Sequence, residues 1–183
     1  EDTMMGAQAS NDQYEKILSY IEIGKQEGAE VLCGGASADL NSGLENGYYI
    51  QPTILKGHNK MRVFQEEIFG PVLQMVRAKD FNEAVNLASD HQYGNGVAMY
   101  TRNGHAAREF AQRVNVGMVG INVPIPVPVA YHTFGGWKRS AFGDTNQHGM
   151  EGVKFWTKVK TITQRWPDGS DTNDNAFVIP TMG

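Results

Sequence analysis

The sequence has a single cysteine, Cys33, among its 183 residues. An internal disulfide framework is therefore excluded, and this cysteine usage fits a reducing compartment such as the cytoplasm. No apolar run approaches the roughly 20 residues of a membrane-spanning helix, and the first ten residues lack the basic start and apolar centre of a signal peptide. We therefore expect no membrane partner.

Basic residues are not in excess, because 16 Lys and Arg residues are set against 20 Asp and Glu residues, for a formal net charge of −4. A nucleic-acid partner is therefore not expected. The five histidines show no pairing at metal-ligand spacing, so no metal site is predicted. A Walker loop, a GxSxG motif and a complete GxGxxG motif are also missing from the sequence.

The composition itself is that of an ordinary globular protein, with 40% hydrophobic and 20% charged residues. This length can bury one core of average domain size or slightly more. The chain opens in polar residues without an initiator methionine, as a loop inside a longer chain would. We therefore expect it to be a piece of a longer protein.

Hydrophobic periodicity predicts helices and strands in alternation. The predicted helices cover residues 11–24 or 11–28, 80–91 and 104–114, with one or two helical turns at 150–157. The predicted strands cover residues 29–35, 48–57, 73–79, 96–101 and 117–123. Such alternation with short connections predicts an α/β fold, a parallel sheet covered by helices.

Two local signals refine this scheme. Pro52 lies within the strand predicted at 48–57 and demotes it to an edge strand or a bulge. Residues 93–96 (YGNG) precede a strand instead of joining a strand to a helix, so they are interpreted as a turn.

The last third of the chain is irregular in character. Residues 124–149 contain three alternating prolines followed by several glycines, which predicts a long loop of the kind that often carries function. Residues 158–166 (KVKTITQRW) are typical of an exposed edge strand able to pair with another chain. Residues 167–183 form a tail without a core of its own.

Residues 65–72 (QEEIFGPV) place two carboxylates beside an aromatic residue on the loop that leads into the strand predicted at 73–79. One interpretation is that Glu66 and Glu67 are solvated, Phe69 is in the core and the Gly-Pro pair is only a turn. The other is that this loop carries function, with one of the carboxylates on the same face as Phe69.

Cys33 is a candidate nucleophile in principle. It lies in a strand-like segment (VLCGG) with no base evident beside it, so we expect a buried, inert thiol. The residues alone therefore indicate an α/β domain with two loops that could carry function.

The segment 66–72 (EEIFGPV), followed by 134–138 (FGGWK) and 160–163 (KTIT), resembles the C-terminal part of the aldehyde dehydrogenase superfamily. Residues 121–156 are similar to the CoA-acylating methylmalonate-semialdehyde dehydrogenase branch. Residues 4–32 and 47–72 are more similar to the bacterial acetaldehyde and related aldehyde dehydrogenases that hydrolyse their acyl-enzyme. The similarity changes between Val72 and Gly94, which is compatible with natural divergence, a recombined gene or a built chimera.

The resemblance implies a fold and an organisation. The expected fold is part of a catalytic domain, a parallel Rossmann-like sheet with helices on both faces. The resemblance further implies three parts: a partial catalytic domain at 1–157, an oligomerisation strand at 158–166 and a C-terminal tail at 167–183. The strand would cross to a partner subunit, so a homo-oligomer is expected.

The resemblance also implies cofactor and substrate contacts. Glu67 would bind the ribose hydroxyls of the nicotinamide in NAD, and Phe69 would pack beside the nicotinamide ring. Substrate contacts would come from an apolar wall suited to a small aldehyde. The residues assigned to that wall are Val123, Ile125, Val127 and Phe134. An equally favoured alternative is that Pro124, Pro126 and Pro128 make this stretch a rigid structural loop.

The catalytic cysteine of the family belongs to a motif that Cys33 does not match, so no catalytic residue is assigned in this chain. The first functional hypothesis is part of an NAD-dependent aldehyde dehydrogenase that works through a thiohemiacetal and a thioester, with CoA as acceptor. The second is a non-catalytic folding or oligomerisation module. The choice of aldehyde, of CoA or water, and of NAD or NADP stays open.

Overall fold

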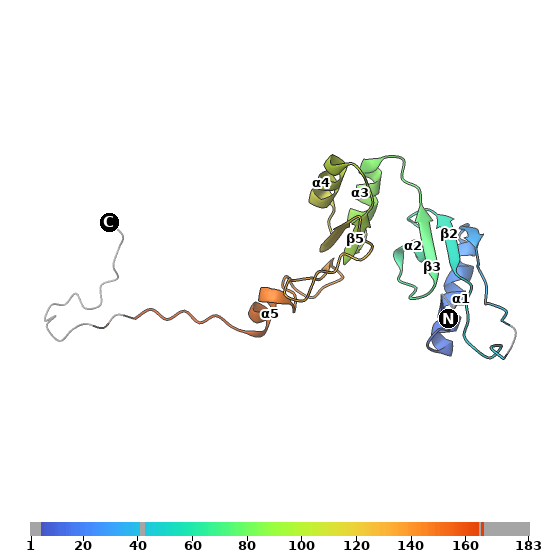
Figure 1. Cartoon of the computed structure of the whole chain (residues 1–183), viewed down its shortest axis with the longest axis horizontal. Helices are drawn as coiled ribbons and strands as arrows, with labels where there is room; N and C mark the ends of the chain where they lie inside the picture. The colour runs from blue at the N-terminus through green and yellow to red at the C-terminus, as the bar shows by residue number, and fades with distance from the viewer. Residues whose placement is uncertain (1–4, 41–42, 165, 167–183) are drawn as a thin grey trace.

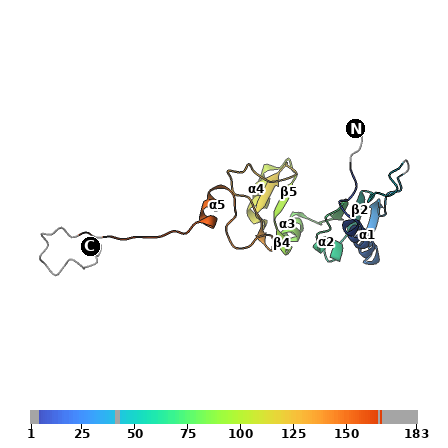
Figure 2. The same ribbon diagram turned by 90° about the horizontal axis from the view of Figure 1, so that it is seen from below.

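The computed structural model describes residues 5–40, 43–164 and 166. Its elements fall into two groups, which Figures 1 and 2 show beside each other. The first group contains α1 (Asn11–Gln26), β1 (Glu30–Cys33), β2 (Thr53–Gly57), α2 (Arg62–Gln65) and β3 (Val72–Val76). The second contains α3 (Phe81–Ser89), β4 (Tyr93–Gly94), β5 (Gly96–Met99), α4 (Gly104–Arg113), β6 (Met118–Ile121) and β7 (Trp137–Lys138), and α5 (Gly149–Trp156) follows it.

Helix α1 forms where the sequence predicts it. The hydroxyl of Ser10 accepts a hydrogen bond from the Gln13 backbone N–H, which caps the first turn. Ile17 and Ile21, four residues apart, are buried on one face of the helix. A Cβ atom at Gly24 would lie 2.9 Å from Leu55 Cδ1, so the small residue lets α1 approach β2 closely.

The first sheet has the order β1-β2-β3, with β1 antiparallel to β2 and β2 parallel to β3. The expected demotion by Pro52 is wrong, because β2 begins at Thr53, after the proline, and is the central strand. Pro52 lies in the gap between the isolated bridge of Ile50 with Ser37 and the start of β2, so it removes no hydrogen bond from the sheet. Leu55 is fully buried against Ile17 and Val63 in the core of this group.

The second group contains the predicted unit of strand, helix and strand. Strands β5 and β6 pair in parallel, and helix α4 connects them. Asp80 caps α3 and Asn103 caps α4 through side-chain oxygens. A second core joins the two helices to the sheet, and its buried residues are Val85, Phe110, Val114 and Val116.

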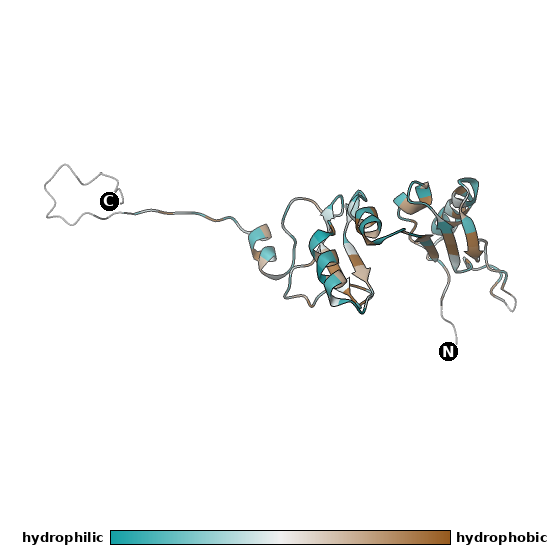
Figure 3. Ribbon diagram, turned by 90° about the horizontal axis from the view of Figure 1, so that it is seen from above, coloured by the Kyte–Doolittle hydropathy of each residue, from teal (hydrophilic) through white to brown (hydrophobic). Residues whose placement is uncertain are grey.

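The predicted α/β class is confirmed, and the structure adds how the strands are distributed. The strands of the described residues form three sheets, of which the β1–β2 and β4–β7 pairs are antiparallel. The interpretation of residues 93–96 as a turn is wrong for Tyr93 and Gly94, which pair with Lys138 and Trp137. In Figure 3 the strands of the first group are largely hydrophobic, whereas the helices combine hydrophobic and hydrophilic residues, as helices with one covered face do.

The loop predicted at 124–149 is irregular apart from β7 and the first residue of α5, and α5 confirms the helical turns predicted at 150–157. Residues 157–164 run away from α5 as an extended stretch in no helix or strand of this chain (Figures 1 and 2). The pairing expected for 158–166 with another chain stays a prediction, and the tail at 167–183 lies outside the described residues. No helix in the described part of the chain is long and apolar enough to cross a membrane.

Candidate active site

The loop 65–72 begins where α2 ends, and its first carboxylate is fixed by two neighbours. Glu66 Oε2 accepts hydrogen bonds from the Tyr20 hydroxyl (2.5 Å) and from Arg62 Nε (2.9 Å). The bond from Tyr20, followed by that from Arg62, lowers the pKa of the Glu66 carboxyl, and the same carboxylate raises the pKa of Tyr20. The interpretation of Glu66 as solvated is confirmed, because the residue is exposed, and the structure adds that its carboxylate is bonded to two side chains.

The next three residues alternate between solvent and core. Ile68 is buried in the first core, whereas Glu67 and Phe69 on either side of it are exposed. The alternative that places Phe69 in the core is wrong, because 71% of this residue is exposed. Phe69 has a φ of 56°, in the left-handed region that a residue other than glycine seldom adopts. Such a conformation is characteristic of functional sites.

Glu67 lines a polar pocket of about 480 Å³ between the two groups of elements. The first group contributes Val63, Phe64, Gln65, Glu66, Glu67 and Gln74, and the second contributes His91, Tyr93, Asn95, Arg139 and Ser140. A carboxylate and a guanidinium therefore line the same pocket, from opposite groups. Phe69 is not part of this lining.

The loop after β6 starts from a tightly bonded asparagine. The Asn122 side chain accepts a hydrogen bond from the Thr101 N–H (2.8 Å) and donates one to the Thr101 carbonyl (3.0 Å). Its backbone N–H also bonds the Met99 carbonyl, and its φ is 58°. Asn122 thus joins the ends of the parallel strands β5 and β6 and sets the direction in which the loop leaves them.

Only part of the predicted apolar wall comes together in this structure. Val127 and Phe134 line one pocket, whereas Val123 and Ile125 lie outside its lining. Val123 lies over β6, since a Cβ atom at Gly120 would be 2.8 Å from Val123 Cγ2. Ile125 is 71% exposed. The substrate roles of all four residues stay predictions.

The FGG segment closes against the second group through close backbone contacts. A Cβ atom at Gly117 would lie 2.0 Å from the Gly135 carbonyl oxygen, so only glycine permits this approach. Lys138, half-buried, donates hydrogen bonds to the carbonyls of Ser89 and His91, both at 2.9 Å. These carbonyls lie at the end of α3, where a cation also interacts favourably with the helix dipole.

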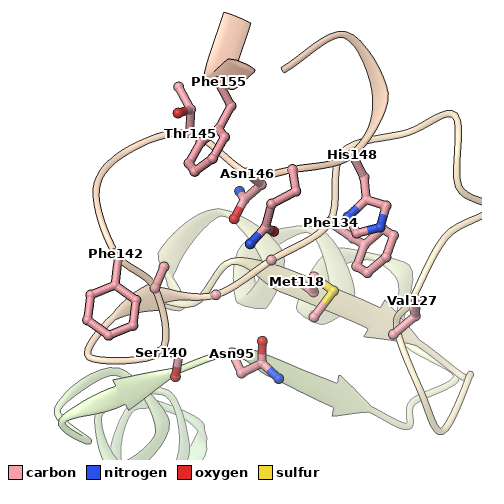
Figure 4. A pocket seen from close by; sticks show the side chains of 14 residues that line it. Asn95, Met118, Val127, Phe134, Ser140, Phe142, Thr145, Asn146, His148 and Phe155 are labelled. Atoms are coloured by element: carbon pink, nitrogen blue, oxygen red, sulfur yellow. The ribbon is translucent and has the colours of Figure 1, made fainter. Parts of the chain in front are cut away.

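The resulting pocket has a volume of about 430 Å³ and both apolar and polar walls (Figure 4). Phe134 and His148 stack at one side, with Val127 nearby, and Asn95 and Ser140 lie on another side. The remaining lining residues are Met118, Gly135, Gly136, Ala141, Phe142, Thr145, Asn146, Gln147 and Phe155. The pocket can therefore hold a small molecule that combines an apolar body with a hydrogen-bonding group.

Sequence reasoning missed Asn95, Ser140 and His148 as pocket residues. His148 had a weak signal, since it lies two residues before the helical turns predicted at 150–157, whereas Asn95 is brought in by β4 pairing with the distant β7. The expectation of a buried thiol is wrong, because Cys33 is exposed on β1, and it lines neither of the two pockets. Within the described residues, no three His, Cys, Asp or Glu side chains gather as a metal site would require.

Comparison with protein families identifies the protein that carries these loops, because residues 1–162 match the sequence model of the aldehyde dehydrogenase family. The chain belongs to the aldehyde dehydrogenase family. It is 46% identical over 168 residues to a malonate-semialdehyde dehydrogenase of Pseudomonas aeruginosa, and 50% identical over 149 residues to an aldehyde dehydrogenase of Rhodospirillum rubrum. These alignments cover 91% and 81% of this chain.

Solved aldehyde dehydrogenase structures give the same result. A Sinorhizobium meliloti protein described as a methylmalonate-semialdehyde dehydrogenase, in complex with NAD, matches 91% of this chain at 50% identity with a TM-score of 0.83. The methylmalonate-semialdehyde dehydrogenase of Oceanimonas doudoroffii matches 89% at 46% identity with a TM-score of 0.81. The chain spans about a third of the length of these relatives, 34% and 33% of the two solved chains.

Proposed function

We propose that this chain forms part of an NAD-dependent aldehyde dehydrogenase that oxidises a small aldehyde through a cysteine thiohemiacetal and a thioester. The observation that carries the proposal is the pair Glu67 and Phe69, both exposed on either side of the buried Ile68. A carboxylate and an exposed aromatic ring, two residues apart on one loop, suit a ribose diol and the flat ring attached to it.

The residues of this chain would bind the cofactor and the substrate and orient them for the reaction. NAD, when bound, supplies the hydride acceptor of the family's chemistry. Glu67 would accept hydrogen bonds from two ribose hydroxyls, and the ring of Phe69 would restrict rotation of the nicotinamide. The nucleophile would come from outside this chain, since Cys33 lines neither the Glu67 pocket nor the Phe134 pocket.

The substrate would lie against the pocket of Val127 and Phe134. Its apolar walls suit the carbon skeleton of a small aldehyde, and Asn95, Ser140 and His148 supply polar groups for a second substituent. The names of the Pseudomonas, Sinorhizobium and Oceanimonas relatives support a semialdehyde with a carboxylate as substrate. We propose CoA as the acyl acceptor, because its thiol can attack the thioester and release the enzyme cysteine.

The test uses Glu67→Gln in a complete enzyme that carries this segment. We expect the single-turnover rate of NADH formation to fall more than the affinity for NAD, because one ribose contact positions the ring without supplying most of the binding energy. An unchanged rate would show that Glu67 is a solvated surface residue without a cofactor contact.

This chain alone should form no NADH with methylmalonate semialdehyde, propanal or acetaldehyde. If it did form NADH and the Cys33→Ala variant did not, Cys33 would be identified as the nucleophile.

A second candidate function is a non-catalytic folding or oligomerisation module. It is supported by residues 157–164, which are extended and exposed, with Val159 94% and Ile162 67% accessible. Such a segment can pair with another chain through its main-chain groups. Association of the chain without any NAD or aldehyde binding would favour this function.

A further inference from the structure

Helix α1 contacts the loop of Glu67 and Phe69 through one polar side chain. The Gln13 amide Nε2 donates hydrogen bonds to two successive backbone carbonyls, that of Ile68 at 3.0 Å and that of Phe69 at 2.6 Å. A glutamine amide has two N–H donors, so both are used here. Gln13 lies in the first turn of α1, 56 residues before Phe69, and its own backbone N–H is held by the Ser10 cap.

The carbonyls that Gln13 binds belong to a strained stretch of backbone. Phe69 has a φ of 56°, and a left-handed conformation in a residue other than glycine persists only where its surroundings hold it. The same residue leaves 71% of its surface exposed, so its ring packs too little to hold the backbone by itself. The hydrogen bonds from Gln13 act at the strained residue and at its predecessor.

The same helix also fixes the loop on its apolar side. Ile68 is buried in a core that includes Ile17, one turn after Gln13. A Cβ atom at Gly70 would lie 2.5 Å from Ile17 Cδ1, so the backbone after Phe69 rests directly on α1. The polar contact at Gln13 and the apolar contact at Ile17 together hold residues 68–70.

We propose that Gln13 is a positioning residue for hydride transfer, acting through the backbone of Phe69. The inference rests on the proposed function, in which the Phe69 ring restricts the nicotinamide. With both amide donors present, the loop keeps the left-handed turn that points the ring outward. Without them, the two carbonyls lose their partners and the turn relaxes toward unstrained conformations.

Amide exchange on this chain tests the structural step without any enzyme activity. Gln13→Met keeps the side-chain length and removes both donors, so we expect exchange at residues 66–72 to accelerate by about tenfold. Asn11→Ala is the matched control, because Asn11 lies in the same turn and its side chain bonds only Glu15 among the described contacts. Equal exchange in Gln13→Met and wild type would overturn the proposal.

Single-turnover NADH formation in a complete enzyme tests the functional step. Gln13→Met should slow it by about tenfold while the Kd for NAD changes by less than about threefold. In a Phe69→Gly background, where glycine adopts the left-handed turn without strain and the ring is absent, Gln13→Met should have no further effect. The same loss in both backgrounds would show that Gln13 does not act through Phe69, and so would overturn the inference.

These outcomes separate the inference from the proposed function. If the wild-type enzyme forms NADH from aldehyde and Gln13→Met does so at the same rate, the inference is wrong and the proposed function stands. If the wild-type enzyme forms none, the proposed function fails, and the positioning role of Gln13 in hydride transfer fails as well. The ratio of the amide-exchange rates of Gln13→Met and wild type at residues 66–72 then still decides whether Gln13 holds the loop.

Discussion

The imidazole of His148 stacks on the ring of Phe134, with the ring centroids 4.1 Å apart and the planes inclined by 26°. Glu151 fixes the two segments that carry these rings, because its Oε2 accepts hydrogen bonds from the Thr133 hydroxyl (2.8 Å) and the Asn146 N–H (3.2 Å). Among the described contacts, His148 Nδ1 is buried without a hydrogen-bond partner. Stacking therefore places His148 at the pocket.

Replacement of His148 tests whether this stack shapes the substrate pocket. His148→Ala in a complete enzyme should lower kcat/KM for a small aldehyde by about three- to tenfold, since an aromatic pair contributes about 0.5–1.5 kcal/mol beyond its buried area. His148→Phe keeps a ring at this position and should retain most of the activity. Steady-state kinetics check both, and equal losses in the two variants would show that the nitrogen atoms matter more than the stack.

Lys138 should be a stability residue of the FGG segment. Lys138→Met removes both hydrogen bonds to the Ser89 and His91 carbonyls, and we expect the free energy of unfolding to fall by about 1–3 kcal/mol. Urea unfolding followed by tryptophan fluorescence measures the loss. The exposed Lys154 of α5 provides the control, because Lys154→Met makes the same substitution and removes the same positive charge. Equal effects in the two variants would contradict the prediction.

Glu151 should make this region sensitive to acid. The hydrogen bond from Thr133, followed by that from the Asn146 backbone, lowers the pKa of Glu151 below its ordinary 4.5. A folded-state pKa below the unfolded value adds stability that is fully present above the unfolded value and is lost as the pH falls through the folded one. The Tm difference between wild type and Glu151→Gln should therefore be larger at pH 7 than at pH 3. A difference independent of pH would contradict this assignment.

The segment 158–166 should mediate self-association. Ile162 is 67% exposed and Trp166 84% exposed, and the described residues 157–164 are extended and in no helix or strand, so their main-chain groups can extend the sheet of a second copy. We expect light scattering to show a dimer or larger assembly, and Ile162→Asp to shift it toward the monomer. Thr161→Asp is the positional control on the opposite face of the predicted strand. A monomer at high concentration whose segment is protected from amide exchange would mean that the edge is satisfied within one chain.

Local sequence signals determined most of the elements. The spacing of Ile17 and Ile21 and the cap at Ser10 predicted α1, and alternating strands and helices predicted the parallel unit of β5, α4 and β6. The motifs EEIFGPV and FGGWK indicated the family that the comparison with residues 1–162 shows. These signals act over a few residues, through caps, periodicity and the conformational limits of glycine and proline, so the sequence alone displays them.

Only the tertiary structure decided the contacts between distant segments. The pairing of β4 with β7 makes Asn95 and Ser140 neighbours, and the bond from Tyr20 to Glu66 crosses 46 residues. The exposure of Phe69 follows from the burial of Ile68 against α1, which no local pattern distinguishes from burial of Phe69 itself. Such contacts depend on how complete elements pack against one another, and this packing is a property of the whole core.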